Sequence, residues 1–162
     1  MVNQSKAEDY FSKIPSIKRI SGVHFFEGKA SLTKLLHFPF YIKEINMIKS
    51  LIDFDSMFSI LSINDILEFM RLRIKNKIQL KILRKQILKY KYEEDDIKEL
   101  REKRFLPDNF EMCDCFYIFV NYVSIFTIVG KPYGVLIENE YYRKTLDSIF
   151  ENLWEVSEKP IQ

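Results

Sequence analysis

The sequence is poor in the residues that make loops, metal sites and catalytic nucleophiles. Among 162 residues there are four glycines, five prolines, two cysteines and two histidines. So little glycine and proline excludes a collagenous or loop-dominated chain. The scarcity of cysteine and histidine argues against a structural zinc site. Gly-rich phosphate loops and the HExxH and GxSxG motifs are missing as well.

The two cysteines, Cys113 and Cys115, are separated by one residue, so on a strand both would point to one face. They would then offer two metal ligands. The only histidines that could complete a site are His24 and His37. We therefore expect reduced, buried thiols, with no metal and no other cofactor.

Long apolar runs and a strong net charge are also missing. No apolar run reaches the roughly 18 residues that span a bilayer, and the polar start of the chain, 1–11, lacks a signal-peptide core. We expect a cytoplasmic protein with no membrane partner. The net charge of +2, from 25 basic and 23 acidic residues, gives no bulk attraction to nucleic acid.

Isoleucine, lysine and aromatic residues are abundant instead. The chain has 21 Ile, 18 Lys, 14 Phe and 9 Tyr but only 2 Ala. Codon use in an AT-rich genome accounts for this bias, and the alternative is an aromatic binding surface. We favour the core, because most of the aromatic residues lie inside strand-like runs. The length predicts a single domain.

Apolar periodicity predicts strands and helices that alternate along the chain. The expected strands are 22–26, 56–61, 78–83, 104–106, 113–120, 123–129 and 133–137, and the expected helices are 29–36, 42–51, 63–76, 92–101 and 140–156. The 56–83 region reads as a βαβ unit and 113–129 as a hairpin. We predict an α/β fold, a mixed sheet covered by helices. The expected inward-facing helix residues are Ile66, Met70, Ile74, Ile149, Phe150 and Leu153.

The segment 71–91 contains basic residues and no acidic one. One interpretation is a patch for anions or nucleic acid, with the candidate residues Arg71, Arg73, Lys75, Lys81 and Arg84. The alternative, which we favour, is a solvated helix face followed by an edge strand, because lysines protect strand edges.

Four stretches of the chain resemble motifs of one protein family, and they follow one another in the order and spacing that the family has. They are Phe25-Phe26-Glu27-Gly28-Lys29 with Leu32 and Leu35-Leu36, the passage 69–83, the element Leu100-Arg101 with Arg104-Phe105-Leu106-Pro107, and the end 137–154 with Phe150 and Leu153-Trp154. Over about residues 18–156 the chain resembles the C-terminal sensor domain of archaeal TrmB-like transcriptional regulators. No single motif is highly specific, and the order of the four carries the resemblance.

The resemblance implies a phospholipase-D-like fold, an α/β/α sandwich. Active members of that fold carry H-x-K-x4-D, and the hairpin is where the motif would fall. Asp114, Phe116 and Asn121 then stand at its His, Lys and Asp positions. An Asp and a Phe supply neither an imidazole nucleophile nor a cation. We therefore expect no catalytic residue, no enzyme activity, and these three as candidate ligand-binding residues.

The family implies a small-molecule effector, often a sugar, and a homodimer. It also implies a winged helix that binds DNA, which needs roughly 60 to 80 residues. About 20 residues precede the first matching strand, so we expect DNA binding to come from a separate domain or partner. We assign 1–16 as a tail or lead-in helix, 17–156 as the domain and 157–162 as a tail. The rival functions are a degenerate phosphodiesterase or nuclease and a nucleic-acid-binding module.

Overall fold

The fold is built on one mixed, eight-stranded sheet with the strand order β1-β2-β8-β7-β6-β3-β4-β5. The computed structural model describes residues 19–20, 22–86, 96–107, 109–127 and 129–160. Strand β3 pairs with β4 and β4 with β5 in parallel, and the other neighbours are antiparallel. The strands are β1 (Arg19–Ile20), β2 (Val23–Glu27), β3 (Met47–Leu51), β4 (Gln79–Arg84), β5 (Arg101–Phe105), β6 (Asp114–Phe119), β7 (Tyr122–Thr127) and β8 (Tyr133–Glu138).

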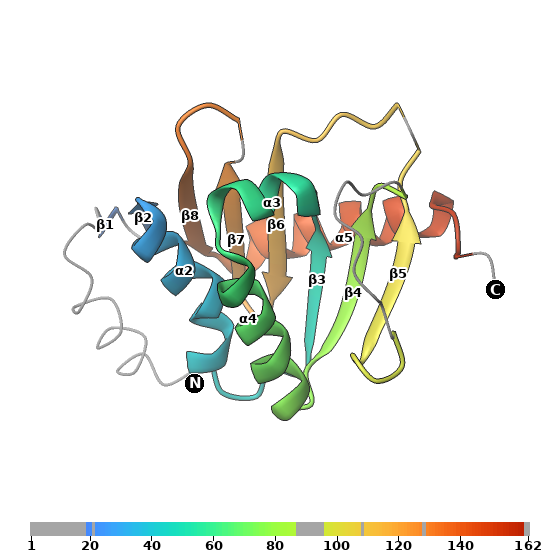
Figure 1. Cartoon of the computed structure of the whole chain (residues 1–162), viewed down its shortest axis with the longest axis horizontal. Coiled ribbons are helices and arrows are strands. Elements are labelled where there is room, and N and C mark those ends of the chain that lie inside the picture. The colour runs from blue at the N-terminus through green and yellow to red at the C-terminus, as the bar shows by residue number, and fades with distance from the viewer. Residues whose placement is uncertain (1–18, 21, 87–95, 108, 128, 161–162) are drawn as a thin grey trace.

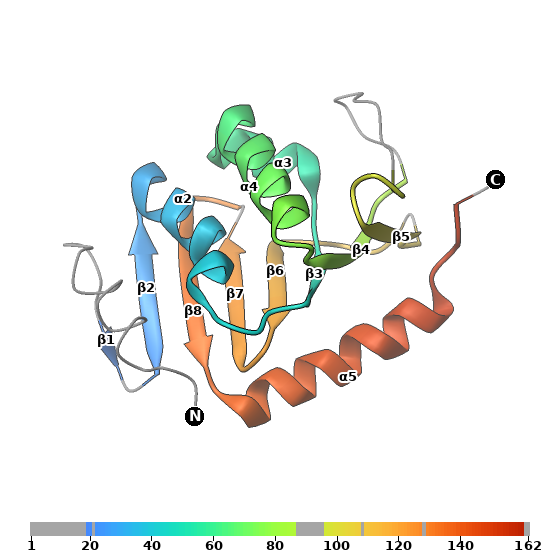
Figure 2. The same ribbon diagram turned by 90° about the horizontal axis from the view of Figure 1, so that it is seen from below.

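Helices cover both faces of this sheet, as predicted. One face carries α2 (Lys29–His37), the 3-10 helix η1 (Phe38–Tyr41), α3 (Phe54–Ile60) and α4 (Ile63–Lys75). The long helix α5 (Glu140–Val156) crosses the other face (Figures 1 and 2). The result is the expected α/β/α sandwich. No helix in the described ranges is long and apolar enough to cross a membrane.

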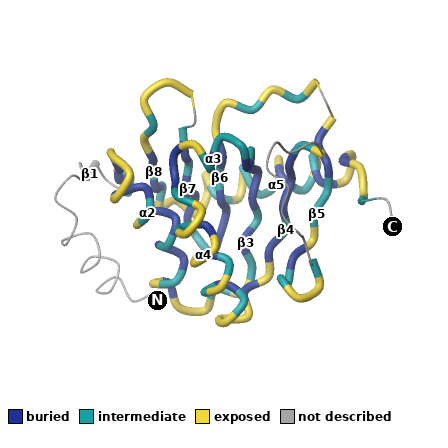
Figure 3. The backbone as a smooth tube through the Cα atoms, viewed as in Figure 1, coloured by how far each residue is buried: buried dark blue, intermediate teal, exposed yellow. Residues whose placement is uncertain are grey.

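Two apolar clusters form the core, one on each side of the sheet. The larger lies under α2, η1, α3 and α4 and includes Phe26, Phe38 and Phe126, all fully buried. The smaller lies under α5 and centres on Phe150 and Trp154, whose rings stack 5.8 Å apart. Figure 3 shows the buried backbone concentrated in the central strands. Most of the abundant aromatic residues in these strands therefore fill the core.

Side-chain caps set the starts of α3 and α4. Asp53 accepts the N–H groups of Asp55 and Ser56, at 3.2 and 3.5 Å. Ser62 and Asp65 form a reciprocal capping box at the start of α4. Such caps satisfy amide groups that the first helical turn leaves without partners.

Two sequence predictions were wrong around these caps. Residues 56–61 were predicted as a strand, but the Asp53 cap starts α3 there. Residues 42–51 were predicted as a helix, but Met47–Leu51 is strand β3, paired on both sides. Its apolar spacing suits either structure, and pairing with β4 and β6 decides the outcome. The βαβ unit is real, but its first strand is β3 and it crosses through two helices.

The region before β6 also differs in part from expectation. The predicted helix 92–101 lies partly outside the described residues, and its last residue, Arg101, begins β5. The expected strand 104–106 is the end of that longer strand. Beyond α5, Glu158 forms an antiparallel bridge with Phe105, so the chain remains attached to β5 past residue 157. The predicted lead-in segment 1–16 lies outside the described residues.

Candidate ligand-binding site

Asp114 and Phe116, two of the three predicted site residues, line one hollow of about 280 Å³. Alternate side chains of a strand point to the same face, so both lie on the α5 side of β6. Phe110 and Glu111, from the loop that leads into β6, and Tyr142, from α5, complete much of the wall. The hollow therefore lies between the start of β6 and the first turns of α5.

The start of α5 is fixed next to this hollow. The Asn139 side chain accepts the N–H of Tyr142 at 2.9 Å and caps the helix. Leu146, one turn further along, lines the hollow and packs against the cluster of Phe150 and Trp154. Because the helix is anchored at its cap and through its apolar face, the Tyr142 wall is held in place.

The charge of the hollow is negative. Asp114 and Glu111 contribute carboxylates, and no lysine, arginine or histidine stands among the described residues that line it. Phe110, Phe116 and Tyr142 add aromatic surface. Carboxylates accept hydrogen bonds from hydroxyl and ammonium groups and repel phosphate, while aromatic rings attract cations and apolar faces. The arrangement suits a neutral polyhydroxyl or a cationic ligand.

Asn121, the third predicted site residue, is not part of the hollow. It lies in the two-residue turn between β6 and β7, at the opposite end of β6 from Asp114. Its backbone carbonyl accepts the N–H of Asn139 at 3.1 Å. The preceding Val120 adopts a left-handed φ of 48° that closes the turn. Asp114 and Phe116 therefore share the hollow, whereas Asn121 lies at the far end of the strand, in the hairpin turn.

The two cysteines have different environments. Cys115 is fully buried on the α3 side of β6, where its Sγ accepts the N–H of Asp53 at 3.1 Å. Burial raises the pKa of its thiol to about 12. Cys113 precedes the strand and is exposed, so the expectation of two buried thiols was wrong for this residue. Neither forms a disulfide, and the described residues contain no cluster of potential metal ligands.

Arg73 does not belong to a surface patch. It is fully buried, and its guanidinium donates to the backbone carbonyls of Ile78, Leu100 and Glu99, at 2.9, 3.2 and 2.5 Å. Helix α4 points this position into the core, because its apolar face contains Ile66 and Phe69. The guanidinium therefore connects the end of α4 with the segments that precede β4 and β5.

Lys81 and Arg84 are also turned away from the predicted patch. Lys81 lies on the α5 face of β4, 3.5 Å from Glu151 and 5.2 Å from the Trp154 ring centre. Arg84 is buried over Phe105 and donates to the Lys85 carbonyl at 2.7 Å. Arg71 and Lys75 remain exposed on α4. The five residues do not form one patch, because helix and strand direct them to different surfaces. The favoured alternative was wrong in part as well, since β4 pairs with both β3 and β5 and is not an edge strand.

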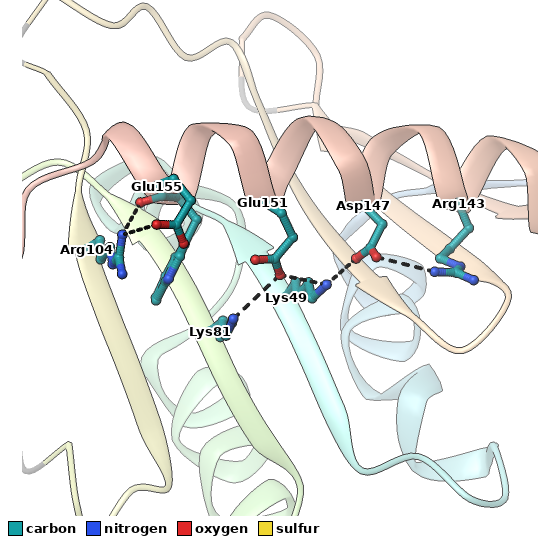
Figure 4. A network of polar contacts seen from close by, with 8 residues as sticks. Lys49, Lys81, Arg104, Arg143, Asp147, Glu151 and Glu155 are labelled. Atoms are coloured by element: carbon teal, nitrogen blue, oxygen red, sulfur yellow. Dashed lines mark hydrogen bonds and ion pairs between the residues drawn. The ribbon is translucent and has the colours of Figure 1, made fainter.

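Sequence reasoning missed an ion-pair network beneath α5. Lys49 on β3 lies 2.5 Å from Asp147 and 2.8 Å from Glu151 (Figure 4). Arg143 and Lys81 extend the network along the helix, and Arg104 binds the Trp154 carbonyl at 2.5 Å. The spacing of Asp147, Glu151 and Glu155 was the available signal, since residues four apart share a helix face. Their partners come from strands far away in the sequence.

Phe110, Glu111 and Tyr142 were missed as well. They come from a loop and a helix start, which carry no periodic pattern that would connect them with β6. Their proximity results from the position of α5 across the sheet.

No protein-family model matches the sequence, and no curated protein shows a significant match. Solved structures do match. TrmBL2, an archaeal chromatin protein that shows a novel mode of DNA binding, has a TM-score of 0.57 and 18% identity, covering 97% of this chain and 62% of its own. Nuc, a phospholipase D family member from Salmonella typhimurium, has a TM-score of 0.59 and 13% identity, and the match covers 86% of this chain and 98% of Nuc.

NucT from Helicobacter pylori has a TM-score of 0.55 and 10% identity, covering 99% of this chain and 96% of its own. This chain spans about three fifths of the TrmBL2 chain. At these identities the similarity concerns the fold. The protein therefore has the phospholipase-D-like fold, which a TrmB-like chromatin protein also has.

Proposed function

We propose that this chain is a non-enzymatic small-molecule-sensing domain of the TrmB regulator type, with its site in the hollow at Asp114 and Phe116. One observation carries the proposal. Asp114 and Phe116, which stand at the His and Lys positions of the motif, line a hollow with two carboxylates and no lining cation. This is the opposite of the environment that an anionic phosphodiester needs.

Catalysis by phosphoryl transfer requires an imidazole nucleophile and a positive charge that stabilises the equatorial oxygens. A carboxylate at 114 and a benzyl group at 116 supply neither. Glu111, on the loop before β6, adds a second negative charge to the same wall. We therefore assign the site to binding.

A sugar or related polyol is the ligand class that we favour. Carboxylates accept hydrogen bonds from ligand hydroxyls, and the faces of Phe116 and Tyr142 suit the apolar side of a sugar ring. Another cavity, between the sheet and α4, has only about 30 Å³. That is room for about two water molecules, so it is too small for a sugar.

Isothermal titration and thermal shift with a panel of mono- and disaccharides test this site. A ligand that binds the folded state raises its apparent stability. We expect at least one sugar to bind, and the double variant D114A/E111A to lose that binding. Glu102→Ala, an exposed carboxylate on β5, is the matched control and should bind normally. If the double variant binds the same sugar as well as the control does, the hollow is not the binding site of that sugar.

Hydrolysis of a chromogenic phosphodiester, with and without divalent metals, tests the absence of catalysis. We expect a background rate. Activity that co-purifies with the protein and disappears in Asp114→Ala or Asn121→Ala would overturn the non-enzymatic assignment and favour the degenerate phosphodiesterase.

A nucleic-acid-binding module is the second candidate. The similarity to TrmBL2, which binds DNA, favours it. Arg71 and Lys75 are the two members of the predicted patch that remain on the α4 surface, and they would be the phosphate contacts.

A further inference from the structure

The outward side of α5 carries a shallow groove of about 940 Å³. Residues four apart form two rows along it. The first row contains Lys144, Ser148, Asn152 and Val156, and the second contains Thr145, Ile149 and Leu153. Side-chain rows at this spacing are the ridges that interlock when two helices pack. The sheet lies on the other side of α5 (Figure 2), so this face is open to a partner.

The groove has the chemistry of a helix-packing surface. Ile149 is 54% and Val156 73% exposed, and their spacing of seven residues places them two turns apart on the same side of the helix. Thr145 and Ser148 are small, so a second helix could approach closely between them. Phe110, from the loop before β6, extends the apolar surface at one edge.

The charges that flank the groove are arranged for a second copy of the same helix. Lys144 precedes Ile149 by five residues and Glu155 follows it by six. Eleven residues are about three helical turns, so both charges lie on one flank of the groove. If two copies of α5 run antiparallel about Ile149, Lys144 of each copy faces Glu155 of the other. A parallel two-fold pair would leave Lys144 about three helical turns away from Glu155 of the other copy.

We propose that this groove is the interface of a symmetric homodimer, in which α5 of two copies packs antiparallel about Ile149. A two-fold axis makes such a surface self-complementary. Lys144 already contacts Glu140 at 2.6 Å on the surface, and Glu155 lies 3.9 Å from Arg104 with 72% of its side chain exposed. Both charges are therefore near water and available to the partner copy.

The interface is small. A 17-residue helix is about 25 Å long, and two such helices bury less than the roughly 1,600 Å² of a standard interface. We therefore expect the dimer to dissociate in the micromolar range.

Sedimentation equilibrium across micromolar concentrations tests the interface. We expect Ile149→Glu to raise the dissociation constant at least about tenfold, as for a central interface residue. Ile63→Glu on α4 is the matched control, because Ile63 is also 54% exposed, and it should dimerise normally. Circular dichroism checks that both variants are folded.

Charge reversal tests the orientation. We expect Lys144→Glu and Glu155→Lys each to weaken the dimer, and the double variant K144E/E155K to restore it. If the wild type has the mass of a single chain at every concentration, the proposal is overturned. This is the result expected if another segment covers the groove. A dimer that tolerates Ile149→Glu, or a double reversal without recovery, would overturn it too.

Discussion

At the scale of single residues, Arg73 shows how a charged side chain can serve the fold. Its guanidinium donates to three backbone carbonyls, at residues 78, 99 and 100. These groups lie where the chain enters β4 and β5, so one side chain joins α4 to two neighbouring parallel strands. A buried carbonyl without a donor costs free energy comparable to its lost hydrogen bond.

Arg73→Met should therefore lower the free energy of unfolding by about 3 kcal/mol or more, because it retains volume but leaves the carbonyls without this donor. Urea denaturation measures the loss. Lys75→Met, two residues along on the exposed face of α4, should stay within about 0.5 kcal/mol of the wild type. Equal stability of the two variants would show that Arg73 has no structural role.

Prediction from sequence was weakest at this scale. A run of lysines and arginines shows charge but not direction, so Arg73, Lys81 and Arg84 were grouped with Arg71 and Lys75. Asp114 and Phe116 were proposed from the motif that the family resemblance implies, and the structure places both on the wall of one hollow. Glu111 and Tyr142 could not be found, since their closeness to β6 depends on tertiary contacts.

At the scale of elements, α5 has the predicted bounds, and of its three predicted inward residues Phe150 and Leu153 contact the core but Ile149 does not. Phe150 and Trp154 are buried, whereas Ile149, predicted to face inward, is 54% exposed. Adjacent apolar residues lie about 100° apart on a helix, so Ile149 and Phe150 cannot both be central. The acidic residues on the sheet side decide the rotation, because Asp147 and Glu151 meet Lys49.

Phe150→Ala should cost about 3 to 5 kcal/mol of unfolding free energy, because it leaves a cavity beneath α5. Ile149→Ala, its neighbour, should cost less than about 0.5 kcal/mol. Both are measured by chemical denaturation at a low protein concentration, where self-association contributes least. A large loss of unfolding free energy for Ile149→Ala under these conditions would contradict the described rotation of α5, in which Ile149 faces away from the sheet.

The ion pairs beneath α5 make its attachment sensitive to acid. Burial, the largest single effect, would raise the pKa of Glu151, but the hydrogen bonds and charges of Lys49 and Lys81 together outweigh burial and lower the pKa below the ordinary 4.5. In Lys49 burial opposes ionisation, yet the bonds to Asp147 and Glu151 raise its pKa above 10.5. A carboxyl with a lowered pKa in the folded state stabilises the fold above its unfolded pKa, and this effect disappears as pH falls through the folded value.

Glu151→Gln should therefore lower stability at neutral pH and match the wild type well below pH 4.5. Glu151 is more than a third exposed, so the neutral-pH loss should be modest, about 0.5 kcal/mol. Denaturation at a series of pH values gives the difference, with Glu68→Gln on the exposed side of α4 as control. A difference that stays constant across the series would exclude the ion pair as its cause.

At the scale of the whole molecule, the distribution of charge separates ligand sensing from nucleic-acid binding. Each phosphate contact contributes about −0.9 to the slope of log affinity against log salt for duplex DNA. If Arg71 and Lys75 contact DNA, the variant R71A/K75A should reduce that slope by about 2 units. We expect this protein to bind DNA weakly, and we expect R71A/K75A to leave the salt slope unchanged. A steep slope that this variant reduces would favour the nucleic-acid-binding module.

The overall architecture was predictable where local pattern and tertiary pairing agree. The hairpin β6–β7, strand β8 and helix α5 have strong periodicity and one clear boundary each. Strand β3 and helix α3 have similar apolar runs, and only the Asp53 cap and pairing with β4 and β6 distinguish them. The strand order follows from contacts between distant segments, which a single sequence does not specify.

That strand order also has a consequence for synthesis on the ribosome. Strand β2 lies between β1, a strand of two residues, and β8, which begins 106 residues after β2 ends. Until β8 has left the exit tunnel, β2 has no long partner, although β3 and β4 can already pair. Because closing so long a loop is slow, the N-terminal hairpin and α2 should wait for the last third of the chain. During that interval the nascent chain exposes an unpaired strand edge, the kind of surface that chaperones protect.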